Sequence, residues 1–255
     1  MSQEFDAIFF DLGETLRILH RDAAYEADAR RKIAVMLGWT GDPEVLGRIL
    51  DERYEVYRKW AFDNMAETAE VELWTRWMAY DFPRERVILN AVDLSFQYRQ
   101  SKGFRLLVRH GYETITELHR RGYKLGIISN LITTREVPDW LIADRLAQYF
   151  DAVVLSAVCR IRKPSPDIYL LGAEQIQVDP ARCAYIGDNF NRDVTGSKAA
   201  GFGLNVIYTN PEKLEKQLKT VSDANRPDGL VYDFLELLDV FPGAPCFNPD
   251  AMRPI

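Results

Sequence analysis

The chain has 255 residues, of which 47% are hydrophobic and 27% charged, which is enough to bury one large core or a core plus a smaller domain. Its formal net charge of -6 argues against a nucleic-acid partner, because a phosphate backbone attracts a basic surface. No apolar stretch is long enough to span a bilayer and the first residues do not resemble a secretion signal, so we expect a cytoplasmic protein without a membrane partner.

Three cysteines, Cys159, Cys183 and Cys246, show neither a CxxC pair nor a metal-ligand spacing. An odd number of unpatterned cysteines is typical of reduced thiols, and we expect these to be buried as small hydrophobic side chains.

The first predicted element is a strand over residues 7–10, Ala-Ile-Phe-Phe, which ends on Asp11. Four consecutive apolar residues favour a central parallel strand that is covered on both faces. In an open α/β sheet the carboxyl ends of the strands line the ligand crevice, so Asp11 is placed for chemistry.

A long helical insert is predicted next, from about residue 17 to about residue 105. Apolar residues recur there every three or four positions, and Gly, Asp and Pro separate the periodic segments. The predicted helices cover Asp22–Leu37, Pro43–Phe62, Glu67–Tyr80 and Arg84–Gln100.

From Gly111 onward, helical and strand patterns alternate, which predicts a doubly wound parallel sheet with right-handed crossovers. We therefore expect an α/β core over residues 1–16 and 106–240, the helical insert over 17–105, and an extended, Pro-rich tail over 241–255. The helices are expected over Tyr112–Arg121 with Gly122 as C-cap, Trp140–Tyr149, Asp167–Gln175 and Asp193–Ala200, and the strands over Lys124–Asn130, Ala152–Ser156, Cys183–Ile186 and Leu204–Tyr208.

Polar residues occur at three further strand ends or loops of this predicted core. Ser129 and Asn130 follow one strand, Lys163 lies in the turn Arg162–Pro166, and Asp188 and Asp193 follow another strand. Carboxylates from two strands, a hydroxyl and a lysine are the groups needed to bind a divalent metal and a phosphate together.

These four segments, in this order, resemble the motifs of the haloacid dehalogenase superfamily, most of whose members hydrolyse phosphate esters. The resemblance covers residues 5–18 and about 111–208, and the helical insert looks like the C1-type cap of that superfamily. It implies an HAD-like Rossmannoid core with an inserted cap, and a hydrolase that requires Mg²⁺ and acts on a small phosphorylated metabolite through an aspartyl-phosphate intermediate.

The resemblance also implies roles for single residues. Asp11 would be the nucleophile, assisted by Lys163, and Ser129, Asn130 and Lys163 would bind the phosphate. The metal ligands would be the side chains of Asp11 and Asp188 and the backbone carbonyl of Gly13. Thr15 would hold its loop through its hydroxyl. Asn189 and Asp193 would support the metal ligands without contacting the metal.

Gly13 departs from the usual pattern Asp-x-Asp-Gly-Thr, because it stands where the second Asp, the general acid/base, is expected. We therefore expect a slow phosphatase or one that prefers esters with good leaving groups. Glu14 and His20 are candidate replacements, but the side chain next to Gly13 should point in another direction, and a surface histidine is the simpler interpretation of His20.

Two other function classes remain open. A 2-haloacid dehalogenase uses the same fold and nucleophile without a metal, although clustered acids beside a nucleophilic Asp should repel unless a cation lies between them. A non-catalytic binding or regulatory protein would also explain the loss of the acid at position 13. Substrate choice would depend on insert residues that face the site, for which the candidates are Tyr25, Trp60, Asn64, Arg76 and Trp77.

Overall fold

A computed structural model describes residues 4–219, 221–222 and 225–243. The predicted parallel α/β sheet is confirmed: in these residues six parallel strands lie in the order β5-β4-β1-β6-β7-β8. The strands are β1 (Ala7–Phe10), β4 (Lys124–Ser129), β5 (Ala152–Leu155), β6 (Cys183–Gly187), β7 (Leu204–Tyr208) and β8 (Gly229–Val231).

Strand β1 is buried on both faces, as its apolar run predicts. Ile8 and Phe10 pack in one cluster with α5 (Gly111–Arg120), and Ala7 and Phe9 in another with α8 (Pro166–Gln175). The alternation of side chains along a strand explains this division between the two faces.

The register of the sheet determines which polar residues meet. Phe10 of β1 is aligned with Ile127 of β4 and with Ile186 of β6. The residues that follow these positions therefore leave three adjacent strands at the same edge, and they include Asp11, Ser129 and Asp188.

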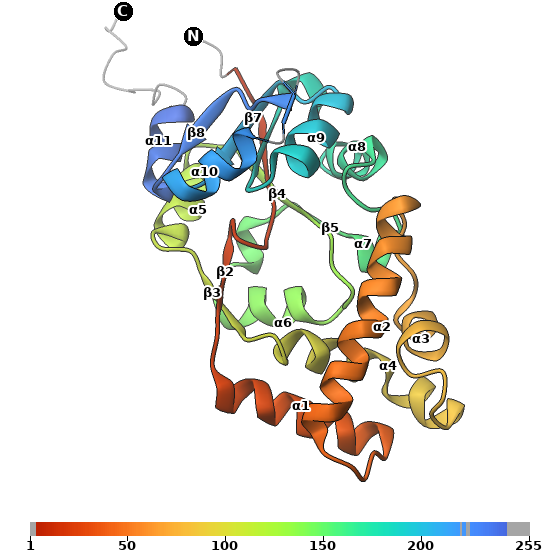
Figure 1. The fold of residues 1–255 in the computed structure, drawn as a ribbon. Coiled ribbons are helices and arrows are strands. Elements are labelled where there is room, and N and C mark those ends of the chain that lie inside the picture. The colour runs from red at the N-terminus through yellow and green to blue at the C-terminus, as the bar shows by residue number, and fades with distance from the viewer. Residues whose placement is uncertain (1–3, 220, 223–224, 244–255) are drawn as a thin grey trace, which may run out of the picture.

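The helical insert has a hydrophobic core of its own, which includes Tyr57, Trp74 and Leu94. Its first helix begins after Asp22, whose carboxylate accepts a hydrogen bond from the Tyr25 amide, and ends at Gly38 with a left-handed φ of 73°. Figure 1 shows this insert in a layer apart from the sheet. Its elements are α1 (Ala23–Leu37), α2 (Pro43–Asp63), α3 (Glu70–Glu72), a π-helical turn (Leu73–Met78) and α4 (Arg84–Gln100).

The two ends of the insert are strands, which the sequence did not predict. β2 (Arg17–His20) pairs antiparallel with β3 (Phe104–Leu107), and the exposed His20 stacks on Phe104 with ring centroids 5.6 Å apart. Each strand has four residues, three half-buried and one exposed, without regular alternation of polarity, so only the long-range pairing defines these strands.

The insert makes a second contact with the core, which we call the 65–67/160–162 clamp. The Arg162 amide donates to the Met65 carbonyl at 3.0 Å, and the Glu67 amide donates to the Arg160 carbonyl at 2.9 Å. The buried Glu67 carboxylate accepts hydrogen bonds from Tyr57, Ser156 and Arg162. The insert is thus attached at β2/β3 and, independently, beside α7 (Ser156–Cys159).

Several predicted boundaries were wrong. The helix expected over 140–149 is α6 (Glu136–Ala143) followed by a short 3₁₀ turn (Ala147–Tyr149), because Arg145 adopts a left-handed φ of 55° between them. The helix predicted over 193–200 is a π-helical turn (Phe190–Val194) and α9 (Thr195–Ala199), and that predicted over 67–80 is α3 and its π-helical turn. The sequence did not predict α7, α10 (Pro211–Leu218), β8 or α11 (Leu237–Val240).

The predicted tail begins too early. Phe241 is fully buried and packs edge-on against Tyr123, so the core extends at least to this residue, while 244–255 lie outside the described residues. Cys183 is buried as predicted, Cys159 is half-buried, and Cys246 lies outside the described residues.

Candidate active site

Asp11 follows β1 and lies at the centre of the polar cluster. Its amide donates to the Ile186 carbonyl at 2.8 Å, which holds the residue against β6. Its Oδ1 accepts a hydrogen bond from Ser129 Oγ at 3.1 Å and lies 2.8 Å from Lys163 Nζ. The carboxylate, which is almost completely buried, is therefore stabilised by one hydroxyl and one cation on the same oxygen.

Lys163 is fully buried, and its ammonium group lies between two carboxylates. Nζ is 2.8 Å from Asp11 Oδ1 and 2.8 Å from Asp193 Oδ1, and it donates to Tyr185 Oη at 2.7 Å. The backbone of Lys163 is held by Asn130, whose side-chain oxygen accepts from the Lys163 amide while its nitrogen donates to the Lys163 carbonyl. The predicted phosphate ligand Asn130 thus uses its side chain to position the lysine.

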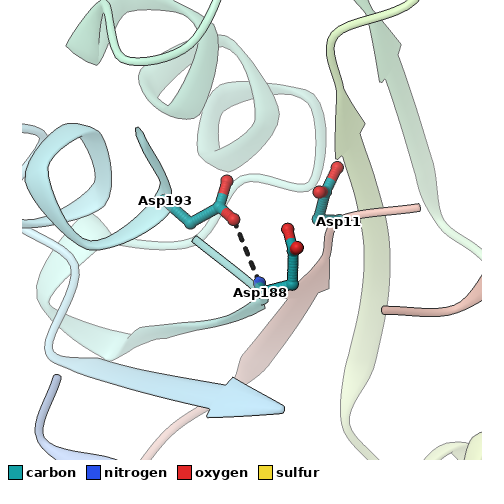
Figure 2. A group of neighbouring side chains, drawn as sticks. All are labelled: Asp11, Asp188 and Asp193. Carbon is teal, nitrogen blue, oxygen red and sulfur yellow. Dashed lines mark hydrogen bonds between the residues drawn. The ribbon is translucent and has the colours of Figure 1, made fainter. Parts of the chain in front are cut away.

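Asp193 anchors the loop that follows β6. Its Oδ2 accepts a hydrogen bond from the amide of Asp188 at 3.1 Å (Figure 2) and another from the amide of Asn189 at 3.0 Å. Gly187 permits this approach, because a Cβ there would lie 2.6 Å from Asp193 Oδ2. Burial would raise the pKa of Asp193, but Arg192 and Lys163 outweigh it and hold this pKa below its usual range.

Arg192 is a site residue that the sequence analysis missed. Its Nη2 lies 3.1 Å from Asp11 Oδ2, 2.9 Å from Asp188 Oδ1 and 3.5 Å from Asp193 Oδ2. Lys213 of α10 donates to the other oxygen of Asp188 at 2.5 Å. The spacing of four residues from Asp188 is a signal that could have placed Arg192 beside it, because helical turns bring such pairs together.

The environment of Asp188 opposes ionisation of its carboxyl group. Burial raises its pKa to about 6, repulsion from Asp193 and Asp11 adds to this effect, and Arg192 and Lys213 act against it. Asp188 is thus more easily protonated than Asp193.

The cluster fits a hard divalent cation. Asp11, Asp188 and Asp193 are buried, and each offers one carboxylate oxygen such that all three oxygens lie within 4.8 Å of one another (Figure 2). An all-oxygen ligand set suits Mg²⁺ or Ca²⁺ rather than a softer transition metal. Asp11 Oδ2 and Asp188 Oδ1 are, however, the oxygens that contact Arg192, so a metal on them requires this side chain to move.

The loop after Asp11 differs from the prediction at Thr15 and has space for a larger side chain at Gly13. A Cβ added at Gly13 would meet no heavy atom within 4 Å, so a larger side chain fits there. Thr15 Oγ1 is buried without a hydrogen-bond partner among the described residues, and the hydroxyl therefore does not hold the loop as predicted. Glu14 adopts a left-handed φ of 58° and its carboxylate accepts from the Leu19 amide at 3.3 Å.

A cavity of about 270 Å³ opens onto the cluster. Glu14 lines it together with Asp11. The lining contains none of the five insert residues proposed to select the substrate, and Arg76, for example, is exposed and paired with Glu72. The described residues around the cavity are Asp11, Leu12, Gly13, Glu14, Leu19, Arg99, Arg105, Ser129, Asn130, Leu131, Asp188 and Arg192.

A comparison with known protein families now identifies this arrangement. Residues 5–201 match the family model of the haloacid dehalogenase-like hydrolases. The chain belongs to this family. The protein is therefore a hydrolase.

Individual relatives of this hydrolase include phosphatases. A glyceraldehyde 3-phosphate phosphatase of Methanothermobacter thermautotrophicus is 26% identical over 92% of this chain and 98% of its own length. A phosphoglycolate phosphatase of Escherichia coli K12 is 31% identical over 52% of this chain and 50% of its own. The hydrolase spans about half the length, 41–53%, of several curated relatives that it matches.

A solved structure of a 2-haloacid dehalogenase from Pseudomonas syringae shares the fold of this hydrolase. The TM-score is 0.65, with 20% identity over 92% of this chain and 97% of the other.

Among the described residues, no helix combines the length and apolar character needed to cross a membrane.

Proposed function

We propose that this hydrolase is a Mg²⁺-dependent phosphatase that acts on a small phosphorylated metabolite through an aspartyl phosphate on Asp11. The observation that carries the proposal is that Asp11, in contact with Lys163 and Ser129, lines a cavity of about 270 Å³. A cavity of this size accommodates only a small molecule. Two phosphatases among the relatives, which act on glyceraldehyde 3-phosphate and phosphoglycolate according to their names, support the same substrate class.

The reaction requires Asp11 to attack phosphorus. A carboxylate oxygen forms the new bond to phosphorus while the ester oxygen leaves with its electron pair and takes up a proton. Water then attacks the aspartyl phosphate, which releases inorganic phosphate and restores the carboxylate. Lys163 and Ser129, which contact Asp11, would neutralise and hydrogen-bond the phosphoryl oxygens.

Mg²⁺ held by Asp11, Asp188 and the Gly13 carbonyl would reduce the repulsion between the carboxylate and the phosphate. For these two carboxylates to become ligands, Arg192 must release them. Asp193 keeps its role as an anchor, because its Oδ2 is bound by two backbone amides and its Oδ1 by Lys163. Asn189 supports the same loop by accepting a hydrogen bond from the Arg192 amide.

Glu14 is our candidate for the proton donor to the leaving group. The usual acid is replaced by Gly13, and Glu14 is the adjacent acid that lines the cavity. His20 is the weaker candidate, since its ring stacks on Phe104 and the residue does not line the cavity.

A metal-independent 2-haloacid dehalogenase is the second candidate function, and one observation favours it. Three clustered acids repel one another unless a cation lies between them, and Arg192 supplies such a cation from the protein itself. The acidic cluster alone therefore does not exclude this activity.

We also propose that residues 1–16 and 106–240 form the catalytic core and 17–105 the cap, with Phe241 added to the core. The buried clusters support this division: two contain residues of β1, whereas a third is formed by insert residues and one core residue, Ile132.

One screen tests the proposed function. The protein is assayed with 4-nitrophenyl phosphate and with 2-chloropropionate, each with excess Mg²⁺ and with excess EDTA. We expect phosphate release only with Mg²⁺, and Asp188→Ala should abolish it whereas the exposed control Asp28→Ala should not. Halide release in EDTA would establish the dehalogenase instead, and neither product would indicate a non-catalytic protein.

A further inference from the structure

Two arginines outside the four motifs line the same cavity as Asp11. Arg99 is the penultimate residue of α4, and Arg105 lies in β3, where the chain returns from the insert to the core. Their side chains are largely buried, at 25% and 11% exposed. Guanidinium groups in such a position bind anions more strongly than on an open surface, because less water competes with them.

The charges around this pair do not balance. Arg99 Nε donates to Glu136 Oε2 at 2.8 Å, and Arg105 Nη1 lies 3.6 Å from Glu136 Oε1. Within the described part of the chain, Glu136 is the one carboxylate at ion-pair distance from either arginine. The two guanidinium groups share this one carboxylate, so one of the two positive charges has no ion-pair partner of its own.

A neighbouring arginine does not change this balance. Arg17 is paired with Asp144 at 2.9 Å, and its other contact is a hydrogen bond to the Arg105 carbonyl. Burial and the charge of Arg99 lower the pKa of Arg105 to about 10 against the opposing charges of Glu136 and Glu14, so the guanidinium group remains charged at neutral pH.

We infer that Arg99 and Arg105 bind a carboxylate of the substrate, so that the substrate is a small phosphomonoester which also carries a carboxylate. This inference rests on the proposed phosphatase function. A carboxylate fits because its single charge matches the one positive charge without an ion-pair partner of its own, whereas a second phosphate would bring up to two negative charges. Its planar oxygens also match the paired donors of a guanidinium group.

The test compares three substrates: phosphoglycolate, the uncharged analogue ethyl phosphate, and ethylene glycol bisphosphate. In the wild type we expect the highest kcat/KM for phosphoglycolate. Arg105→Gln should raise the KM for phosphoglycolate by about 10- to 100-fold, the range for one hydrogen bond to a charged group, and leave that for ethyl phosphate within about twofold. The control Arg76→Gln, on the exposed face of the insert, should change neither.

Glu136→Gln provides a second variant that a merely structural role would not explain. It frees both guanidinium groups, so it should lower the KM for phosphoglycolate and leave that for ethyl phosphate unchanged. Equal losses with both substrates in Arg105→Gln and in Glu136→Gln would overturn the inference, as would a preference for the bisphosphate. If the wild type hydrolyses neither 4-nitrophenyl phosphate nor these esters, the proposed function itself fails.

Discussion

The cavity has two differently built parts, one formed by the sheet and one by the segment that leaves the insert. The sheet contributes Asp11 and Asp188 from adjacent strand ends, and the register of β1 with β6 alone brings them together. The returning segment contributes Arg99 and Arg105 from a helix end and a short strand. The reactive groups therefore follow from sheet topology, whereas the groups proposed to select the substrate depend on how the insert is attached.

The largest expected effect tests the sheet part. Asp11→Asn should reduce phosphate release by more than about 100-fold, because the amide is nearly isosteric but a poor nucleophile. Steady-state kinetics with 4-nitrophenyl phosphate measures this loss, and circular dichroism checks that the variant is folded. Asp28→Asn, on the surface of α1, serves as control. Residual activity above about a hundredth of wild type would remove Asp11 from the role of nucleophile.

The second prediction asks whether the sheet part lacks an acid. Because nothing occupies the space around Gly13, Gly13→Asp should fold and raise the rate on an alkyl phosphate by roughly 100-fold, the typical contribution of a positioned acid. The rate on an aryl phosphate should change little, since its leaving group needs no proton.

Glu14→Gln tests whether Glu14 or another group donates the proton to the leaving group. If Glu14 is the acid, this variant should lose alkyl phosphatase activity and keep aryl phosphatase activity. If it keeps both and the wild type cleaves both esters equally well, another group supplies the proton.

The third prediction concerns pH. The Asp188 carboxyl has a pKa of about 6, and only its ionised form can bind a cation, so affinity for Mg²⁺ should fall as the pH falls through 6. Calorimetric titration at pH 5 should show binding about tenfold weaker than at pH 7, with close to one proton released per ion at pH 5. Equal affinities at the two pH values would contradict this role of Asp188.

The smallest expected effect concerns Arg192, which compensates the acids from within the sheet part. In EDTA, Arg192→Gln should lower the free energy of unfolding by about 1–3 kcal/mol, because three buried carboxylates lose a charged partner. Saturating Mg²⁺ should remove most of this difference. Thermal unfolding of the variant and of the exposed control Arg58→Gln measures it, and a deficit that Mg²⁺ does not reduce would show that Arg192 and the ion do not share a site.

Sequence patterns predicted the sheet part of the molecule well, for two physical reasons. Buried parallel strands read as uninterrupted apolar runs, as in β1, and a polar residue directly after such a run lies at the reactive edge. The long amphipathic helices α2 and α4 are defined by local periodicity, and their predicted bounds agree with the structure to within one residue.

The arginine part could not be predicted in the same way. Arg99 lies near the end of a helix where charged residues are ordinary, and Arg105 belongs to a strand that only pairing with β2 defines. Arg192 has a local signal in its spacing from Asp188, but its contact with Asp11 joins residues 181 positions apart. Side chains recruited from distant segments carry no periodic pattern, so structure was needed to find them.

The 65–67/160–162 clamp limits how the insert can move. An insert joined to the core only through β2 and β3 could rotate away from the cavity about this connection. Here a second attachment ends at Arg162, the residue directly before Lys163, and it includes a buried ion pair with Glu67. Any wide separation of insert and core must break this attachment and pull on the backbone that carries the lysine. Access to the cavity and the charge environment of Asp11 are therefore mechanically linked.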